Sequence, residues 1–322
     1  MNIDMIRAAA QRLEGHARRT PLLRSPFLDE IAGKPLYIKP ECLQHTGSFK
    51  FRGGWSALSA LSEAARARGV IAYSSGNHAQ GVAYAAQLHG APAVIVMPSD
   101  APRLKIENTR AHGAEVVLYD RLTESREEIG AALAEERGLT LIKPYDEPEV
   151  IAGQGTCGLE IAAQAAEAGI SEAEVLVCCG GGGLSSGVAL ALAADAPGLR
   201  VRTVEPEGFD DVARSLASGT RMQNDMTARS ICDAILTPSP GELTFPILAA
   251  HCGPGLTVSD DAALDAMAQA FQRLKLVVEP GGAAALAAAL YHARETDAPS
   301  LVAVVTGGNV DADVFAQALS RL

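Results

Sequence analysis

The sequence predicts an α/β protein in which parallel sheets are flanked by helices. Short apolar runs alternate along the chain with segments of helical pattern, and several of these segments end at a glycine, the residue that favours a left-handed helix C-cap. Apolar strands separated by helices of this length are typical of βαβ units, whose strands are buried on both faces. Aromatic residues make up only 4% of the chain, which favours helices on a sheet over a β-sandwich.

The first series of alternating elements occupies the region from 70 to 144. Gly90 and Gly113 are expected to end the first two helices, and Thr123 is expected to cap the third, whose first turn is rich in glutamate. Strands are expected at 70–75 (VIAYSS), 92–98 (PAVIVMP), 115–119 (EVVLY) and 140–144 (TLIKP), and helices at 76–90, 103–113 and 123–138.

A second series of strands follows further along the chain, near 174–183, 199–208 and 300–309. A helical pattern with a serine or aspartate cap lies between them at 259–274. Because the two series are separate in sequence, we expect two lobes: a small mobile domain over 65–140, and a large domain formed by 1–64 and 141–322.

Composition excludes several classes of protein. The formal net charge is −11 and no long basic run occurs, so nucleic acid is not an expected partner. The six cysteines form no C-x-x-C pair, which leaves a zinc or redox motif without support. The N-terminus lacks the apolar core of a signal peptide, and no run of about 20 uncharged apolar residues could span a membrane. We therefore expect a cytoplasmic protein.

Lys50 lies in the segment GSFKFRGG (47–54), between two phenylalanines and close to three glycines. The segment is too rich in glycine for a good helix interior. A lysine in such apolar surroundings is a candidate for a desolvated amine, because desolvation lowers the pKa toward nucleophilic use. An ordinary solvated surface lysine is the alternative.

Four consecutive glycines, Gly180 to Gly183, separate a predicted strand from a predicted helix that starts near Leu184. Glycines allow backbone N–H groups to converge on an anion, and the helix N-terminus adds a partial positive charge. The spacing fails the dinucleotide fingerprint and no G-K-[ST] follows, so a small phosphorylated ligand is favoured over a nucleotide. Together with a reactive lysine, this favours pyridoxal phosphate (PLP), whose aldehyde bonds to a lysine.

Five segments carry a resemblance to a known family: TGSFKFRGG, SSGNHAQGVA, VIAGQGT, CGGGGLSSG and TGGNVD. In this order they resemble the motifs of fold-type II PLP enzymes, specifically the threonine/serine dehydratase (ammonia-lyase) and serine racemase group. The resemblance runs from about Thr20 to Asp311. It implies the two-lobed, tryptophan synthase β-like fold.

The resemblance also implies roles for individual residues. Lys50 would hold PLP and move the Cα proton, with Phe49 packed on the cofactor ring and Asn77 bonded to its 3′ oxygen. The phosphate would be held by Gly180, Gly181, Gly182 and Gly183, and the substrate carboxylate by Ser74, Ser75, Gly76 and His78.

Thr306 would face the pyridine nitrogen, where relatives have a serine or cysteine. A neutral hydroxyl cannot keep that nitrogen protonated, which suits rapid elimination. Ser75 matches the serine that acts as the second acid/base in the racemases. Dehydratases often carry it too, so binding of the substrate carboxylate is the alternative role.

The segment EPEGFDD (205–211) resembles the divalent-cation site of part of this family. Glu205, Asp211 and the backbone carbonyl of Phe209 would offer the oxygen ligands that Mg²⁺ or Ca²⁺ requires. A solvated acidic loop is the alternative.

The residues and the resemblance together predict a PLP-dependent ammonia-lyase that converts L-threonine or L-serine to a 2-oxo acid and ammonia. The alternatives within this chemistry are a 3-hydroxyaspartate dehydratase, which a cationic side chain near the substrate would favour, and a serine racemase. A nucleotide-dependent dehydrogenase and a non-catalytic amino-acid sensor are the rivals from other classes. The only partners expected are the amino-acid substrate and, by resemblance, a second copy in a homodimer. Ala234, where relatives commonly have glycine, leaves the substrate open.

Overall fold

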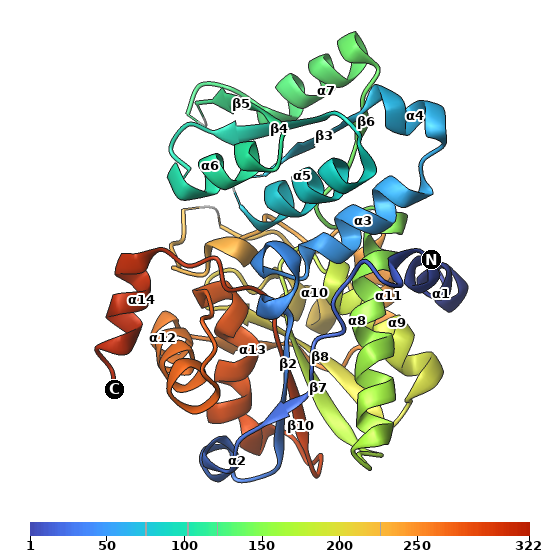
Figure 1. Cartoon of the computed structure of the whole chain (residues 1–322). Coiled ribbons are helices and arrows are strands. Elements are labelled where there is room, and N and C mark those ends of the chain that lie inside the picture. Colours follow the sequence, from blue (N-terminus) through green and yellow to red (C-terminus); the bar gives the residue numbers. More distant parts are fainter. Residues whose placement is uncertain (75, 102, 121, 226) are drawn as a thin grey trace.

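The computed structural model describes residues 1–74, 76–101, 103–120, 122–225 and 227–322. The chain forms two lobes, each built on its own sheet with helices against it (Figure 1). The predicted α/β class, with parallel sheets flanked by helices, is confirmed.

The large lobe contains a six-stranded sheet in the order β1-β2-β10-β7-β8-β9. All neighbours pair in parallel except β1 and β2, which are antiparallel. The strands are β1 (Leu23–Arg24), β2 (Leu36–Pro40), β7 (Ala173–Cys178), β8 (Leu199–Pro206), β9 (Leu256–Val258) and β10 (Leu301–Val305).

Helices bury both faces of this sheet. Along β7, Val175 and Val177 pack into the core beneath α8 and α9, whereas Leu176 and Cys178 pack into the core beneath α12 and α13. The alternation follows from the two-residue period of a strand, and it explains why the strand is apolar throughout. The helices of this lobe are α1 (Ile3–Leu13), α2 (Pro26–Ala32), α3 (Lys50–Ala60), α8 (Pro148–Glu167), α9 (Gly183–Asp195), α10 (Asp211–Ser218), α11 (Thr244–His251), α12 (Asp260–Gln269), α13 (Pro280–Tyr291) and α14 (Ala312–Leu319).

Short helical turns complete the large lobe. Among the described residues four are 3-10 turns, and one is a π-helical turn that continues α12 where the sequence predicts one uninterrupted helix over 259–274. They are η1 (Glu41–Leu43), η2 (His45–Gly47), η3 (Asp233–Ile235), η4 (Ala270–Leu274, the π turn) and η5 (Ala293–Glu295).

The small lobe contains a four-stranded parallel sheet in the order β5-β4-β3-β6. Its elements follow the predicted first series, although 65–140 as the bounds of a separate domain stays a prediction. The elements are β3 (Val70–Tyr73), β4 (Ala93–Pro98), β5 (Glu115–Tyr119), β6 (Thr140–Leu141), α4 (Glu63–Arg68), α5 (Asn77–His89), α6 (Arg103–Ala111) and α7 (Arg126–Arg137).

The cap predicted for α7 is wrong. Ser125 is its N-cap, since the Ser125 hydroxyl accepts a hydrogen bond from the Glu128 backbone N–H at 3.2 Å. Thr123 instead belongs to the turn before the helix, where its N–H donates to the Asp120 carbonyl oxygen. Serine and threonine are both favoured helix caps, so the path of the turn is what selects Ser125.

The glycine-rich segment after Lys50 is helical, contrary to the expectation from its composition. A Cβ on Gly54 would lie 2.9 Å from the Gly81 carbonyl oxygen of α5, and one on Gly53 would lie 2.9 Å from a methyl of Val150 in α8. These glycines therefore let α3 approach a helix of each lobe, which outweighs their helix penalty of about 1 kcal/mol each.

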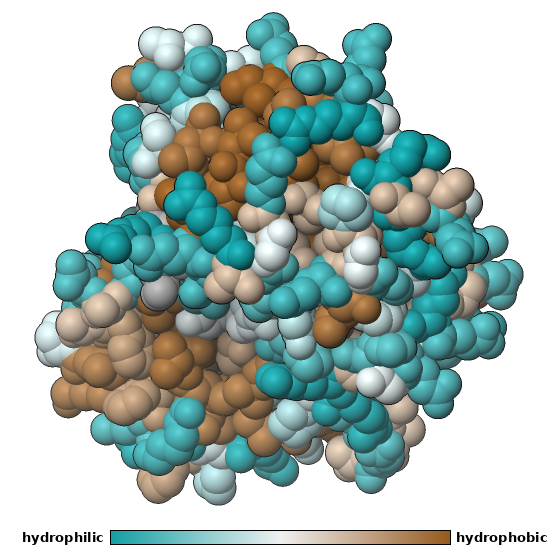
Figure 2. Space-filling view, turned by 45° about the horizontal axis from the view of Figure 1, so that its top comes forward, coloured by the Kyte–Doolittle hydropathy of each residue, from teal (hydrophilic) through white to brown (hydrophobic). Residues whose placement is uncertain are grey.

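Apolar surface gathers at the lower left of the molecule in Figure 2, where Figure 1 places α12 and α14. Phe27 and Ile31 of α2 and Phe271 of the π turn are exposed. Arg273 lies 4.5 Å from the centre of the Phe27 ring, and Phe271 contacts Phe315 of α14 edge to face. In the part of the chain that the structure describes, no helix is both long and apolar enough to cross a membrane.

Candidate active site

A cavity of about 190 Å³ lies between the two lobes. Its walls are formed where chain leaves the carboxyl ends of β3, β7 and β10, the edge at which open parallel sheets bind ligands. The structure therefore brings together residues far apart in sequence. Of the predicted residues, the cavity is lined by Phe49, Lys50, Ser74, Gly76, Asn77, His78, Gly180, Gly181, Gly182, Gly183 and Thr306. Ser75 lies outside the described residues.

Lys50 is the first residue of α3, and its amine points into the cavity region. Nζ donates a hydrogen bond of 2.6 Å to the Pro144 carbonyl oxygen and lies 5.1 Å from the centre of the Phe49 ring. Desolvation lowers the pKa of Lys50 to about 8, because burial disfavours the charged form. Phe49 donates its backbone N–H to the Thr306 carbonyl oxygen at 3.1 Å, which ties the lysine to the loop after β10.

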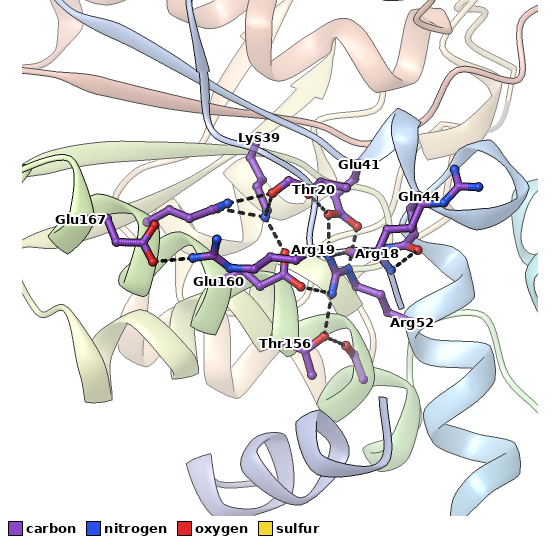
Figure 3. Close-up of polar contacts among 12 residues, drawn as sticks. Arg18, Arg19, Thr20, Lys39, Glu41, Gln44, Arg52, Thr156, Glu160 and Glu167 are labelled. Carbon is purple, nitrogen blue, oxygen red and sulfur yellow. Dashed lines mark hydrogen bonds and ion pairs between the residues drawn. The ribbon is translucent and has the colours of Figure 1, made fainter. Parts of the chain in front are cut away.

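A buried network of charges anchors α3 (Figure 3). The Arg52 guanidinium donates to both carboxylate oxygens of Glu41 and to both of Glu160. Lys39 donates to Glu160 and to the Thr20 carbonyl oxygen. Arg52, Glu41 and Lys39 are almost completely buried. Since Arg52 is two residues after Lys50, this network sets the position of the helix end that carries the amine.

Asn77 is the first residue of α5 and lies between the lobes. Its Nδ2 donates to Glu279 Oε1 at 2.5 Å, and its Oδ1 accepts from Asn309 Nδ2 at 2.7 Å. Because an amide nitrogen has two protons, one remains to contact a ligand. Burial, assisted by the charge of Asp233, raises the pKa of Glu279 to about 7.

His78 is neutral in this site. Burial, followed by the charge of Lys50, lowers the pKa of its imidazole to about 3. Its Nε2 lies 2.9 Å from the Ile142 carbonyl oxygen, an acceptor, so this nitrogen carries the proton and Nδ1 is an acceptor. Nδ1 therefore has no proton to donate to a carboxylate, and its lone pair repels the negative charge. The predicted role of His78 in carboxylate binding therefore depends on its backbone N–H at the start of α5.

The glycine loop has room for an anion only because it lacks side chains. A Cβ on Gly181 would lie 2.2 Å from the Tyr145 ring, and one on Gly183 would lie 2.7 Å from Gln154 Oε1. Gly182 has a φ of +89°, which favours glycine. The loop leads directly into α9, whose first residue is Gly183. The first N–H groups of a helix have no partner within the helix, so the N-terminus of α9 offers hydrogen-bond donors to an anion beside the loop.

The cavity wall also holds polar groups that need a partner. Among the described residues, both polar atoms of the Gln154 carboxamide and the Thr237 hydroxyl are buried without a hydrogen bond. Buried polar groups are almost always paired in native proteins. A lysine with a lowered pKa, a glycine cradle at a helix N-terminus and unpaired polar groups together fit PLP, with Lys50 for its aldehyde and Gly180 to Gly183 for its phosphate.

Arg126 and Tyr145 are among the cavity residues that were not predicted from the sequence. Arg126 begins α7, and its guanidinium carbon lies 5.3 Å from the centre of the Tyr73 ring. Tyr145 packs on Gly181. Neither lies in a glycine loop or in one of the five family motifs, so no local pattern distinguished them as site residues. Ala234, singled out in the sequence, does line the cavity.

The proposed cation ligands lie apart from the cavity wall, at the end of β8 and the start of α10. Burial, followed by the charge of Asp211, raises the pKa of Glu205, and burial raises that of Asp211 to about 6. Glu205 accepts from the N–H groups of Val212 and Ala213, while Asp211 Oδ2 has no partner in the described chain. Phe209 lies buried in the same loop.

No group of three or more His, Cys, Asp or Glu side chains is placed to hold a metal among the residues that the structure describes. A cation at Glu205 and Asp211 would therefore also need the Phe209 carbonyl and water. The cation site at Glu205, Phe209 and Asp211 stays a proposal.

Comparison with known proteins places this geometry in a family. The model of the family described as pyridoxal-phosphate dependent enzyme matches residues 13–307. An L-threo-3-hydroxyaspartate ammonia-lyase of a Pseudomonas species is 48% identical, with 98% of this chain and 97% of the relative covered. A serine racemase of Schizosaccharomyces pombe is 40% identical over 99% and 97%. The crystal structure of a threonine deaminase from T.th. superposes with a TM-score of 0.91 and 47% identity, covering 97% of this chain and 99% of that one.

Proposed function

The chain belongs to the family of pyridoxal-phosphate-dependent enzymes, and we propose that it is an ammonia-lyase acting on L-threo-3-hydroxyaspartate. The products would be the four-carbon 2-oxo dicarboxylic acid and ammonia. The relative at 48% identity supports this substrate. Hydroxyaspartate is the alternative that the sequence left open beside L-threonine and L-serine. The comparisons support it more than they support L-threonine or L-serine.

Arg126 is the observation that carries the proposal. Hydroxyaspartate differs from serine by a second carboxylate, and a carboxylate in a partly enclosed site needs a cation beside it. Arg126 lines the cavity from the small lobe and is held by Glu127 and the Tyr73 ring. We propose that it binds the distal carboxylate.

The residues of the chain divide the work of the reaction. PLP, when bound, draws electrons from Cα and so acidifies its proton. Lys50 would take that proton, since an amine with a pKa of about 8 is partly neutral near neutral pH. The Pro144 carbonyl orients the amine. N–H groups of the 74–78 turn would bind the α-carboxylate. Departure of the Cα proton and the β-hydroxyl removes water, and hydrolysis of the resulting enamine releases ammonia.

The test is 2-oxo acid release by the PLP-loaded protein from L-threo-3-hydroxyaspartate, L-serine and L-threonine. We expect hydroxyaspartate to have the highest kcat/KM. Arg126→Met should lower that value about 10- to 100-fold, as expected for loss of a charged hydrogen bond of about 1.5–3 kcal/mol, and change serine turnover much less. Arg137→Met, at the exposed end of the same helix, is the matched control. Preference for threonine together with an equal effect of Arg126→Met on all substrates would contradict the proposal.

Serine racemisation is the second candidate, supported by the relative at 40% identity. It would need an acid/base on the face opposite Lys50, and Ser75, the candidate, lies outside the described residues. Formation of D-serine from L-serine, followed by chiral chromatography, decides between the two. A Ser75→Ala variant that keeps elimination and loses racemisation would assign both activities.

We also propose a homodimer in the cytoplasm. The resemblance supports the dimer, and the six cysteines, all free thiols, are in keeping with a reducing compartment. Light scattering should then give twice the chain mass of 33.4 kDa. A mass of one chain at micromolar concentration would contradict the dimer.

A further inference from the structure

Lys105 connects the two lobes beside the cavity. It lies on α6 of the small lobe, and its Nζ is 3.1 Å from Oδ2 of Asp233, which begins η3 of the large lobe. Asp233 lines the cavity. The ion pair therefore crosses from one lobe to the other beside the proposed substrate site.

Lys105 is unusually buried for a lysine, with only 8% of its surface exposed. Burial by itself would lower its pKa, but the charges of Asp233 and then Glu279 outweigh it and raise the pKa above the ordinary value. The side chain is therefore a cation, and the large lobe supplies the negative charge that balances it. A buried cation separated from its partner is costly, so the pair favours the arrangement in which the lobes meet.

The stem of Lys105 also packs on the turn between β3 and α5. A Cβ on Gly76 would lie 3.6 Å from Lys105 Cδ and 3.7 Å from Nζ. Ser74, Gly76 and His78 line the cavity and belong to the proposed carboxylate site. A movement of Lys105 relative to Asp233 must therefore move this turn relative to the large lobe.

A second contact holds the same turn from its other end. Asn77 bonds to Glu279 and to Asn309, both in the large lobe. Those bonds fix one side chain at the start of α5, whereas Lys105 supports the turn from the adjacent helix. The two contacts together clamp the turn between the lobes.

We propose that Lys105 is a positioning residue whose ion pair with Asp233 latches the start of α5, at Gly76 and Asn77, onto the large lobe and so sets the affinity for the amino-acid substrate. The latch rests on the proposed role of the turn between β3 and α5, and it does not depend on which amino acid is the substrate. Of these described residues, Asp233 and Gly76 line the cavity and Lys105 does not. Lys105 therefore acts through the residues that it contacts.

Three variants test the latch in the PLP-loaded enzyme: Lys105→Met, Asp233→Asn and the double variant. Each single change should raise KM for the preferred amino acid about tenfold and change kcat less than threefold. The double variant should match the single ones, because the two residues act as one pair. The affinity for PLP should change less than KM, since Lys50 and the glycine loop, which are proposed to hold it, belong to the large lobe. Arg103→Met is the matched control, because this arginine lies on the same helix and is exposed.

The sign of the Asp233→Asn effect distinguishes a latch from direct contact with the substrate. If Lys105 bound the substrate carboxylate itself, removal of Asp233 would free the cation and lower KM. A lower KM in Asp233→Asn, or fully additive effects in the double variant, would overturn the proposal.

Hydrogen–deuterium exchange gives a readout that needs no reaction. Amides of the 76–82 segment should exchange several-fold faster in Lys105→Met and in Asp233→Asn than in the unaltered enzyme, and Arg103→Met should not differ. Equal exchange in all proteins would overturn the latch. If the unaltered enzyme releases no 2-oxo acid from any of the three amino acids, the proposed function fails, while exchange still tests the latch by itself.

Discussion

The environment of a single amine determines how Lys50 can react. The same side chain in water would be almost fully protonated at neutral pH, with a pKa near 10.4. In this site desolvation lowers the pKa to about 8, and no neighbouring charge is needed to explain the shift. About a tenth of the amine is then neutral at pH 7 and half at pH 8.

We therefore predict that Lys50 of the PLP-free protein reacts with an amine-directed reagent such as acetic anhydride with half-maximal labelling near pH 8. The charged form is favoured below this pH, so labelling should fall as the pH falls through 8. Mass spectrometry of the peptide that contains Lys50 measures the extent. Added PLP should protect this lysine. Half-maximal labelling near pH 10.4 would show that the amine is solvated.

At the scale of the element, α3 depends on one buried network. Glycine at positions 53 and 54 gives the helix close neighbours but weak intrinsic stability. Arg52, between Lys50 and these glycines, makes the polar contacts that fix it. The network has two cations, Lys39 and Arg52, and two carboxylates, Glu41 and Glu160, so its formal charge is balanced.

Arg52→Met should destabilise the protein strongly. It would leave Glu41 buried without its main partner, and breaking a buried pair costs about 3–5 kcal/mol. Urea unfolding followed by tryptophan fluorescence measures the loss, because Trp55 lies on the same helix. Arg103→Met, which removes an exposed arginine, should have little effect. A loss below about 1 kcal/mol in Arg52→Met would mean that the helix does not depend on the network.

At the scale of the whole molecule, stability should depend on the proposed cation site. Glu205 and Asp211 are both buried and both have a raised pKa, so ionising both carboxyl groups in this loop at neutral pH opposes folding. A divalent cation would remove this cost.

Millimolar Mg²⁺ or Ca²⁺ is therefore expected to raise the thermal midpoint by several degrees, since a ligand at 100 times its Kd adds about 2.7 kcal/mol. Differential scanning calorimetry measures the shift. Asp211→Asn should abolish it. Asp210→Asn, which removes the neighbouring carboxylate that pairs with Arg214, should retain most of it. The same shift in Asp211→Asn would exclude this loop as the site.

The division into two lobes also explains what each sheet contributes. The large lobe carries Lys50, the glycine loop and Thr306, whereas the small lobe carries the 74–78 turn and Arg126. The groups proposed for the cofactor thus lie mainly on one lobe and those proposed for the substrate on the other. Any change in the distance between the lobes would alter substrate contacts first.

The sequence by itself determined the fold class, the cofactor and eleven of the described residues that line the cavity. Strand and helix periods are local, and a glycine loop after a strand or a lysine among aromatics can be recognised from neighbours in the chain. That Lys50, Asn77, Gly180 and Thr306 share one site was implied by the resemblance of their motifs to those of one enzyme family.

Only the tertiary structure decided which charges face the cavity. Arg126 and Lys105 lie in segments whose pattern is that of ordinary polar surface, and both are separated from Asp233 by more than a hundred positions. Their meeting depends on how the small lobe packs against the large one. The proposed substrate depends on such a cation, whereas the cofactor depends on local loops, and this is why the sequence indicated the cofactor and left the substrate open.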